Sequence, residues 1–184
     1  MPRLFLGLEL PVPVRDCLLS WSAEISGARW QRLDQLHLTL CFLGQLEPEQ
    51  VPAVFQAMAY LPGVPFNLQP VGVGCFGDPQ RPRTLWADVR PVDPVRDLHQ
   101  QVTEQVQAAG LSVQERHFTP HITLARFGRR NGGSAEAFLK NHQSVTAPGF
   151  LVDQVSLFLS QTSEAGSRYQ VLARFPLTAG PTPL

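Results

Sequence analysis

One eight-residue pattern occurs twice in this chain, and it constrains the fold more than any other feature. The segment 37–44 has the sequence HLTLCFLG, and the segment 121–128 has the sequence HITLARFG. Both follow the pattern His–apolar–Thr–Leu–x–x–apolar–Gly and lie about half a chain apart. In a strand, residues i and i+2 share a face, so each histidine lies beside its own threonine while the intervening apolar residue anchors the strand. If the halves pack about an approximate two-fold axis, the two His-Thr pairs meet across a cleft.

Strict alternation along these strands also predicts where the other side chains point. In the second copy it places Ala125 on the face of His121 and Arg126 on the opposite face, so Arg126 reaches the cleft only if the strand twists or ends there. In the first copy it places Cys41 on the face of His37, where we expect a small apolar filler. The opposite face of the first copy is then formed by Leu36, Leu38, Leu40 and Phe42.

The remaining periodicities predict an α+β domain that uses the whole chain, 1–184. The stretch 77–83 (GDPQRPR) is expected to form a turn or a mobile loop. The patterns typical of helices cover 11–25, 47–60, 92–109 and 135–141. The patterns typical of strands cover 3–10, 36–44, 64–76, 84–89, 118–127, 149–160 and 168–175.

Composition excludes several classes of protein. The formal net charge is zero, with 15 basic and 15 acidic residues, which argues against coating nucleic acid by bulk charge but leaves room for a local anion site. Three cysteines without a C-x-x-C pattern argue against a disulfide framework or a cysteine zinc site. We find no secretory signal and no apolar run of about 20 residues. We therefore expect a cytoplasmic monomer without a cofactor and without contact to a membrane.

Two imidazoles and two hydroxyls in one small volume suit the hydrolysis of a phosphodiester. A neutral imidazole can take a proton from water, and an imidazolium can deliver a proton to the departing ribose oxygen. Histidine suits both tasks because its unperturbed pKa is about 6.5. Threonine hydroxyls can donate hydrogen bonds to the phosphate oxygens on which charge develops. This chemistry requires no metal.

The two motifs, HLTLCFLG and FTPHITLARFG, resemble the paired motifs of the 2H phosphoesterase superfamily. Within it, the chain most resembles the bacterial and archaeal RNA 2′,3′-cyclic phosphodiesterases, also called 2′-5′ RNA ligases, and the segments RLFLGLELP, ARWQRLDQ and PRTLWADV extend the resemblance. The resemblance implies a bilobal fold, with two antiparallel sheets around a central cleft, helices outside and two halves related by a pseudo-two-fold axis. It implies hydrolysis of a terminal 2′,3′-cyclic phosphate to a 2′-phosphate, with RNA ends or nucleoside 2′,3′-cyclic phosphates as partners and 2′-5′ ligation as the reverse reaction. Carried over residue by residue, it makes His37 and His121 catalytic, and Thr39, Thr123 and Arg126 substrate-binding.

The resemblance also implies that His121 is the base that activates water and His37 is the acid. Local charge gives a hint in the same direction, because nearby cations lower the pKa of a histidine. The segment 36–43 carries no charge apart from His37, so we expect His37 to hold its proton more readily. The cations near the second motif are Arg126, Arg129 and Arg130.

Three other functions remain open: a nucleotide-binding module without turnover, an enzyme for another small cyclic phosphate such as an ADP-ribose derivative, and a zinc hydrolase. The spacing of His117 and His121 would suit a metal pair on a helix, but Pro120 argues against a helix there. His99 is expected to be solvated on a helix, and His142 is expected at the surface after the short helix.

Aromatic and basic side chains outside the motifs are candidates for contacts to RNA. Phe76 and Tyr169 could stack on a terminal base, although a place in the core is favoured for Phe76. Contacts to phosphate, or solvated loops, are the two interpretations of Arg81, Arg83, Arg129 and Arg130.

Overall fold

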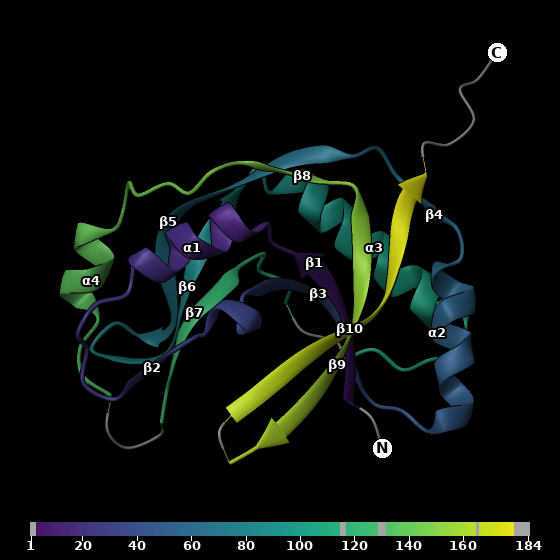
Figure 1. Cartoon of the computed structure of the whole chain (residues 1–184), viewed down its shortest axis with the longest axis horizontal. Helices are drawn as coiled ribbons and strands as arrows, with labels where there is room; N and C mark the ends of the chain where they lie inside the picture. Colours follow the sequence, from purple (N-terminus) through teal and green to yellow (C-terminus); the bar gives the residue numbers. More distant parts are fainter. Residues whose placement is uncertain (1–2, 115–116, 129–131, 165, 179–184) are drawn as a thin grey trace.

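The computed structural model describes residues 3–114, 117–128, 132–164 and 166–178. It is an α+β fold built on a large, strongly curved sheet, with helices packed around it (Figure 1). The helices are α1 (Val12–Ser20), α2 (Val51–Met58), α3 (Asp93–Ala108) and α4 (Glu136–Asn141), with 3-10 turns η1 (Leu33–Gln35) and η2 (Pro48–Gln50). The strands are β1 (Arg3–Glu9), β2 (Ala28–Trp30), β3 (His37–Gln45), β4 (Leu61–Pro62), β5 (Phe66–Asp78), β6 (Arg81–Arg90), β7 (Ile122–Phe127), β8 (Phe150–Val152), β9 (Gln154–Ser163) and β10 (Gly166–Thr178).

The sheet consists of two halves that meet at the two motif strands. One half runs β4-β10-β9-β1-β3, the other runs β7-β6-β5-β8, and β2 adds to β7. The strands β3 and β7 are joined by a single antiparallel pair, Leu38 opposite Ile122. The two sheets that the resemblance implied are therefore continuous at the centre of the molecule, and both motifs lie at this junction.

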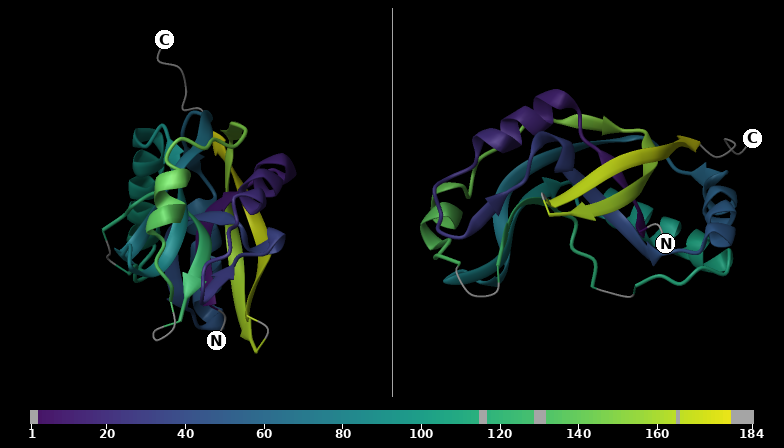
Figure 2. Two further views of the ribbon diagram at one scale, coloured as in Figure 1. Left: turned by 90° about the vertical axis from the view of Figure 1, so that its left-hand side faces the viewer. Right: turned by 60° about the horizontal axis from the view of Figure 1, so that its bottom comes forward.

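The core and the helices reinforce the junction. Leu38 and Ile122 are fully buried, each between the histidine and the threonine of its own motif. The helices α2 and α3 pack together toward one end of the molecule, while α1 and α4 lie toward the other (Figures 1 and 2). None of the described helices is long and apolar enough to cross a membrane.

Some element boundaries differ from those expected. The stretch 77–83 is the turn of a tight hairpin, as one of the two expectations had it, and not a mobile loop, because β5 runs to Asp78 and β6 begins at Arg81. The carboxylate of Asp78 accepts a hydrogen bond from the backbone N–H of Gln80 at 2.8 Å, and Gly77 supplies the positive φ of 91° that the turn requires. The strand expected over 118–127 begins only at Ile122.

The first motif strand carries a β-bulge that overturns the expected alternation. Between Thr39 and Cys41, β3 has one residue more than its partner β1, and Leu40 is the extra residue. As a result Leu40 and Cys41 are both buried, and Phe42 is 45% exposed. The expectations that Cys41 shares the histidine face and that Phe42 faces the core were wrong, because a bulge shifts every later side chain by one position.

The second motif strand carries the same bulge at the same place. Between Thr123 and Ala125, β7 has one residue more than β6, and Leu124 is the extra residue. Leu124 and Ala125 are both buried, and Arg126 is exposed. The bulge therefore returns Arg126 to the face of Thr123, contrary to the alternation expected from His121.

Candidate functional site

His37 is held in one orientation by its own backbone neighbourhood. Its Nδ1–H donates to the carbonyl of Gln35 at 2.7 Å, which leaves Nε2 on the other side of the ring, 3.0 Å from Oγ1 of Thr39. Gln35 is itself buried and fixed, since its Oε1 accepts from the backbone N–H of Arg32 at 2.9 Å and its Nε2 donates to the carbonyl of Ser167 at 2.7 Å. The reactive nitrogen of His37 therefore has a defined position and a defined tautomer.

His121 is oriented in the same way. Its Nδ1–H donates to the carbonyl of Thr119, two residues earlier, at 2.6 Å. In the part of the chain that the structure describes, Nε2 of His121 has no hydrogen-bond partner, and Thr123 follows two residues later. Both imidazoles thus present Nε2 for chemistry, and both use a carbonyl at position i−2 as the orienting group.

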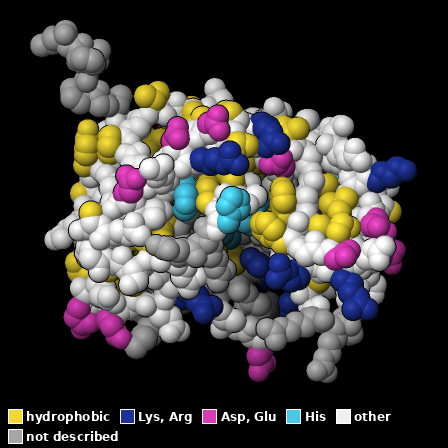
Figure 3. Space-filling model, turned by 180° about the vertical axis from the view of Figure 1, so that it is seen from behind, with side chains coloured by type: hydrophobic (Ala, Val, Ile, Leu, Met, Phe, Trp, Pro, Cys, Tyr) yellow, Lys and Arg dark blue, Asp and Glu magenta, His cyan; other side chains and the backbone are white. Residues whose placement is uncertain are grey.

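A cavity of about 400 Å³ brings the predicted residues together. It lies between the two halves of the sheet, and on the face drawn in Figure 3 histidine side chains lie near the centre with lysine or arginine side chains around them. All five predicted site residues line it: His37, Thr39, His121, Thr123 and Arg126. The remaining lining residues are Arg3, Phe5, Phe42, Ser160, Ser167 and Tyr169.

The two bulges each add a third side chain to the cavity. Phe42 and Arg126 both lie five residues after the histidine of their motif. Each comes two residues after the extra residue of its bulge, which is Leu40 in one strand and Leu124 in the other. Without the bulges, both side chains would point away from the cavity, yet both line it. The site is therefore built from residues 1, 3 and 6 of each motif, with a phenylalanine in one copy and an arginine in the other.

The two imidazoles lie in different aromatic surroundings. The ring centroid of His37 lies 4.8 Å from that of Phe5 and 4.8 Å from that of Tyr169. The ring of His121 meets Phe76 edge-on at 4.9 Å. Phe76 is only half-buried and lines the adjoining cavity, so its expected place in the core was wrong. Tyr169, left open from the sequence, lies in the site.

Burial lowers the pKa of both histidines, and more strongly for His37. Enclosure by the protein lowers the pKa of His37 to about 4, and the guanidinium of Arg126 acts in the same direction. Burial and Arg126 also lower the pKa of His121. The expectation that His37 holds its proton more readily was wrong, because Arg126 faces both imidazoles and burial outweighs the absence of charge in 36–43.

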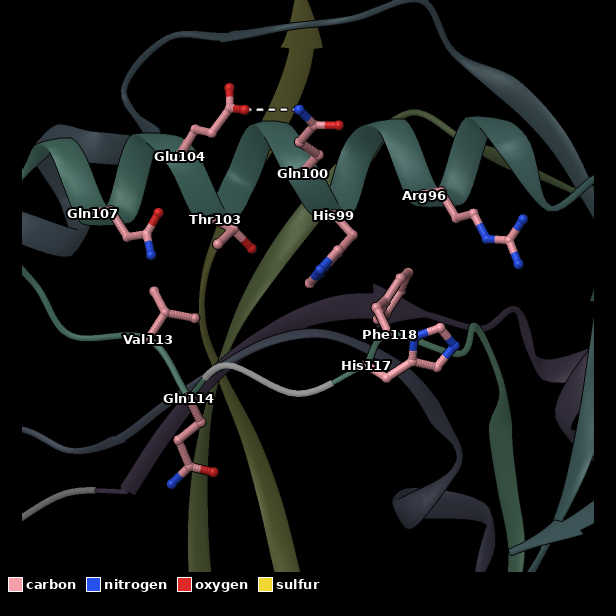
Figure 4. A pocket seen from close by; sticks show the side chains of 10 residues that line it. All are labelled: Arg96, His99, Gln100, Thr103, Glu104, Gln107, Val113, Gln114, His117 and Phe118. Carbon is pink, nitrogen blue, oxygen red and sulfur yellow. Dashed lines mark hydrogen bonds between the residues drawn. The ribbon is translucent and has the colours of Figure 1, made fainter.

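Sequence reasoning missed the groups that hold the two bulges in place. Each bulge leaves a carbonyl that the sheet does not pair. The carbonyl of Leu40 accepts from Nδ1–H of His99 at 2.7 Å, and the carbonyl of Leu124 accepts from the backbone N–H of Gln31 at 2.8 Å. His99 also stacks on Phe118, with 3.8 Å between ring centroids (Figure 4). His99 is thus packed and bonded rather than solvated, and no simple sequence signal marks this contact.

The other candidates lie at the edge of the site or outside it. Arg83 lines a second cavity of about 410 Å³ beside the catalytic one, and Arg81 is exposed at the hairpin. His142 stacks on Phe138 at 4.2 Å and is half-buried after α4. Among the described residues, no group of three or more His, Cys, Asp and Glu side chains could hold a metal ion. Arg129 and Arg130 lie outside the described residues.

The model of a family described as LigT-like phosphoesterases matches residues 8–86 and again residues 89–169. The chain belongs to this family. Each matched segment contains one motif, which agrees with the duplicated construction of the site.

Relatives with known names resemble the chain over most of its length. An RNA 2′,3′-cyclic phosphodiesterase of Escherichia coli is 29% identical, with 96% of this chain and 97% of that protein covered. One of Geobacillus stearothermophilus is 27% identical over 96% of this chain, which spans 58% of the length of that relative. The crystal structure of E. coli LigT in complex with 3′-AMP superposes with a TM-score of 0.77 at 27% identity, covering 97% of this chain and 99% of that one.

Proposed function

We propose that this protein hydrolyses the terminal 2′,3′-cyclic phosphate of RNA to a 2′-phosphomonoester. The observation that carries the proposal is the convergence of two His-Thr pairs, with an arginine beside them, on one cavity between the halves of the sheet. The relatives named RNA 2′,3′-cyclic phosphodiesterases support the choice of substrate. When a 5′-hydroxyl takes the place of water as the nucleophile, the same two proton transfers join the cyclic phosphate end to it through a 2′-5′ linkage.

Two proton transfers account for the reaction. A water molecule attacks phosphorus while Nε2 of His121 takes its proton, and the bond from phosphorus to O3′ breaks while Nε2–H of His37 delivers a proton to O3′. The hydroxyls of Thr39 and Thr123 donate to the non-bridging oxygens, and Arg126 offsets their charge. Base and acid come from different halves of the sheet, as displacement from opposite sides of phosphorus requires.

The hydrogen bond between His37 and Thr39 joins two groups to which we assign roles in the reaction. Nε2 of His37 lies 3.0 Å from Oγ1 of Thr39 in the free protein, so Nε2–H leaves this bond to reach O3′, and the hydroxyl of Thr39 then donates to the phosphate. Nε2 of His121 has no hydrogen-bond partner among the described residues, so a water molecule can bind there. Burial lowers the pKa of His37 in the free protein to about 4, so its role as the acid requires that the anionic substrate raise this pKa and that the proton be taken up with the substrate.

Phe42 and Arg126 give the cavity two unlike walls. Phe42 offers an exposed aromatic face on which a nucleobase can stack, whereas Arg126 offers a planar cation for phosphate. A terminal nucleotide carries one group of each kind, so the two walls favour one orientation of the substrate.

We further propose that the two halves act together as one bilobal domain over residues 1–184 and that the protein works as a cytoplasmic monomer. All three cysteines are free thiols, as a reducing compartment requires. The chemistry assigned to the two imidazoles needs no metal.

The direct test is a product assay on a short RNA that ends in a 2′,3′-cyclic phosphate, run with and without EDTA. We expect a 2′-phosphate product, equal rates in both buffers, and no turnover by the variant His37→Ala/His121→Ala. Tight binding without turnover would instead support a nucleotide-binding module. Activity that disappears in EDTA and returns with zinc would contradict the two-histidine mechanism.

A further inference from the structure

Two arginines lie directly opposite each other at one rim of the catalytic cavity. Arg29 of β2 pairs with Arg126 of β7 in antiparallel register, and both side chains are exposed. Like charges in such a cross-strand pair destabilise a sheet, because their Cβ atoms lie only about 5 Å apart. Among the described residues, neither arginine forms an ion pair with a carboxylate. This arrangement is favourable once an anion lies between the two guanidinium groups.

A cavity at this rim has room for such an anion. Its volume is about 400 Å³, and it adjoins the catalytic cavity, with which it shares Arg126, Ser167 and Tyr169. Its lining carries one negative charge, from Glu164, and three positive charges, from Arg29, Arg126 and a third arginine. That third arginine, Arg32, is already paired with Asp34 at 3.1 Å, so Arg29 and Arg126 supply the available positive charge.

A groove that adjoins the cavity at Arg83, and not the catalytic cavity itself, is less suited to an anion. It runs along α3, has a volume of about 720 Å³ and is lined mainly by amide, hydroxyl and ring side chains (Figure 4). Its charged lining residues are Arg96 and Glu104, and Arg96 also faces Asp93 at 3.9 Å. Its net charge is thus close to zero, whereas the rim at Arg29 is cationic.

We propose that Arg29, together with Arg126, binds a second phosphodiester group of RNA next to the reacting cyclic phosphate. The proposal rests on the function proposed above and extends it from a terminal nucleotide to the RNA chain. Arg126 lines both cavities, so it can contact the reacting phosphate and the neighbouring one, while Arg29 contacts only the second. Arginine suits this position because its planar guanidinium forms paired hydrogen bonds with phosphate oxygens.

The test compares two substrates, a nucleoside 2′,3′-cyclic phosphate and a trinucleotide that ends in the same cyclic phosphate. For Arg29→Gln we expect kcat/KM to fall about tenfold on the trinucleotide and to change less than twofold on the mononucleotide. We also expect the slope of log kcat/KM against log salt on the trinucleotide to become shallower by about 0.7, the value for one phosphate contact on a single strand. Arg29→Lys should restore this slope. Arg96→Gln is the matched control, an exposed arginine in the less cationic groove, and should leave both substrates unaffected.

Ligation distinguishes the two strands that could supply the phosphate. A loss on the trinucleotide in hydrolysis assigns the site to the strand that carries the cyclic end. Unchanged hydrolysis with a raised KM for the 5′-hydroxyl strand in ligation assigns the same site to the acceptor strand. Equal losses on mononucleotide and trinucleotide, no loss in any assay, or a loss with Arg96→Gln in place of Arg29→Gln would overturn the proposal. If the wild-type protein cleaves neither substrate, the proposed function has failed, and this site fails with it.

Discussion

The two motif strands, β3 and β7, have the same backbone conformation but differ in one side chain that lines the cavity. Each motif begins with a histidine whose Nδ1–H bonds to a carbonyl two residues earlier, and each strand carries a bulge after the threonine. They differ in the side chain that the bulge adds to the cavity, Phe42 in one copy and Arg126 in the other. The duplicated backbone thus keeps the histidine and the threonine in place in both copies, while a single side chain in each copy makes the two walls of the cavity unlike.

The copies also differ in how deeply their imidazoles are enclosed. His37 packs against Phe5, Phe158 and Tyr169, and its pKa is lowered to about 4. The pKa of His121 is lowered as well, for the same physical reason. Two motifs of the same pattern thus place their histidines in unequal environments, because the aromatic rings around them come from other strands.

Loss of either imidazole should have the largest effect and should show whether the two copies are equally necessary. We expect His37→Ala and His121→Ala each to lower kcat by about 10²–10⁴-fold, the usual range for removal of a general acid or base. Steady-state kinetics on RNA ending in a cyclic phosphate measures this, and circular dichroism checks the fold. His142→Ala, which lies outside the cavity, is the control. A variant at either motif histidine with a rate near that of the wild type would contradict the paired mechanism.

A nitrophenyl ester separates the two roles, because its leaving group needs no proton. We expect this substrate to restore activity to His37→Ala and not to His121→Ala. Restoration of His121→Ala alone would exchange acid and base while leaving the two-histidine mechanism intact.

The threonines should matter next, and in both copies. Thr39→Val and Thr123→Val remove hydroxyls that we assign to the phosphate oxygens, and one lost donor to developing charge can cost about 3 kcal/mol. We expect lower kcat/KM with little change in the affinity of an uncharged nucleoside fragment. An unchanged kcat/KM for either variant would refute the role of that hydroxyl.

Acid unfolding tests the difference in burial. A histidine whose pKa is lowered by folding contributes stability that is fully present above its unfolded pKa of about 6.5 and is lost as the pH falls toward its folded value. For His37 this loss amounts to roughly 3 kcal/mol at most, between pH 6.5 and 4. Urea unfolding at pH 7 and pH 4.5 measures it. His37→Gln should remove more of the pH dependence than His121→Gln, and equal effects would show that the two environments are alike.

Substitutions in the two unlike walls, Phe42 and Arg126, should have the smallest effect on the kinetics. Phe42→Leu is expected to raise KM about tenfold with kcat nearly unchanged, because a lost base-stacking contact costs roughly 1–3 kcal/mol. Arg126→Gln is expected to lower kcat in addition, because the guanidinium lies beside the reacting phosphate. The same change in KM and kcat for both variants would mean that the two walls do not divide their tasks in this way.

The sequence was sufficient to predict the residues that converge, but not all of their neighbours. His37, Thr39, His121 and Thr123 were predictable because alternation holds from the histidine to the threonine. It fails immediately afterwards, because a bulge depends on the pairing with a neighbouring strand and leaves no mark in its own strand. Residues that the bulge reorients, such as Cys41, were therefore misplaced.

The fold followed the same division between local and long-range information. The long elements and the α+β class were predictable from periodicity. The short strand β2, which carries Arg29, was not recognised because three residues show no periodicity. The pKa order of the histidines was also wrong, because it depends on aromatic rings contributed by β1, β9 and β10.

The single backbone pair between β3 and β7 has a mechanical consequence. Leu38 and Ile122 each lie between the histidine and the threonine of their own motif, so this one pair joins the strand segments that carry both imidazoles. A change in the size of either side chain should therefore alter the distance between the two imidazoles. One buried pair thus sets the spacing of the two groups that we propose as acid and base.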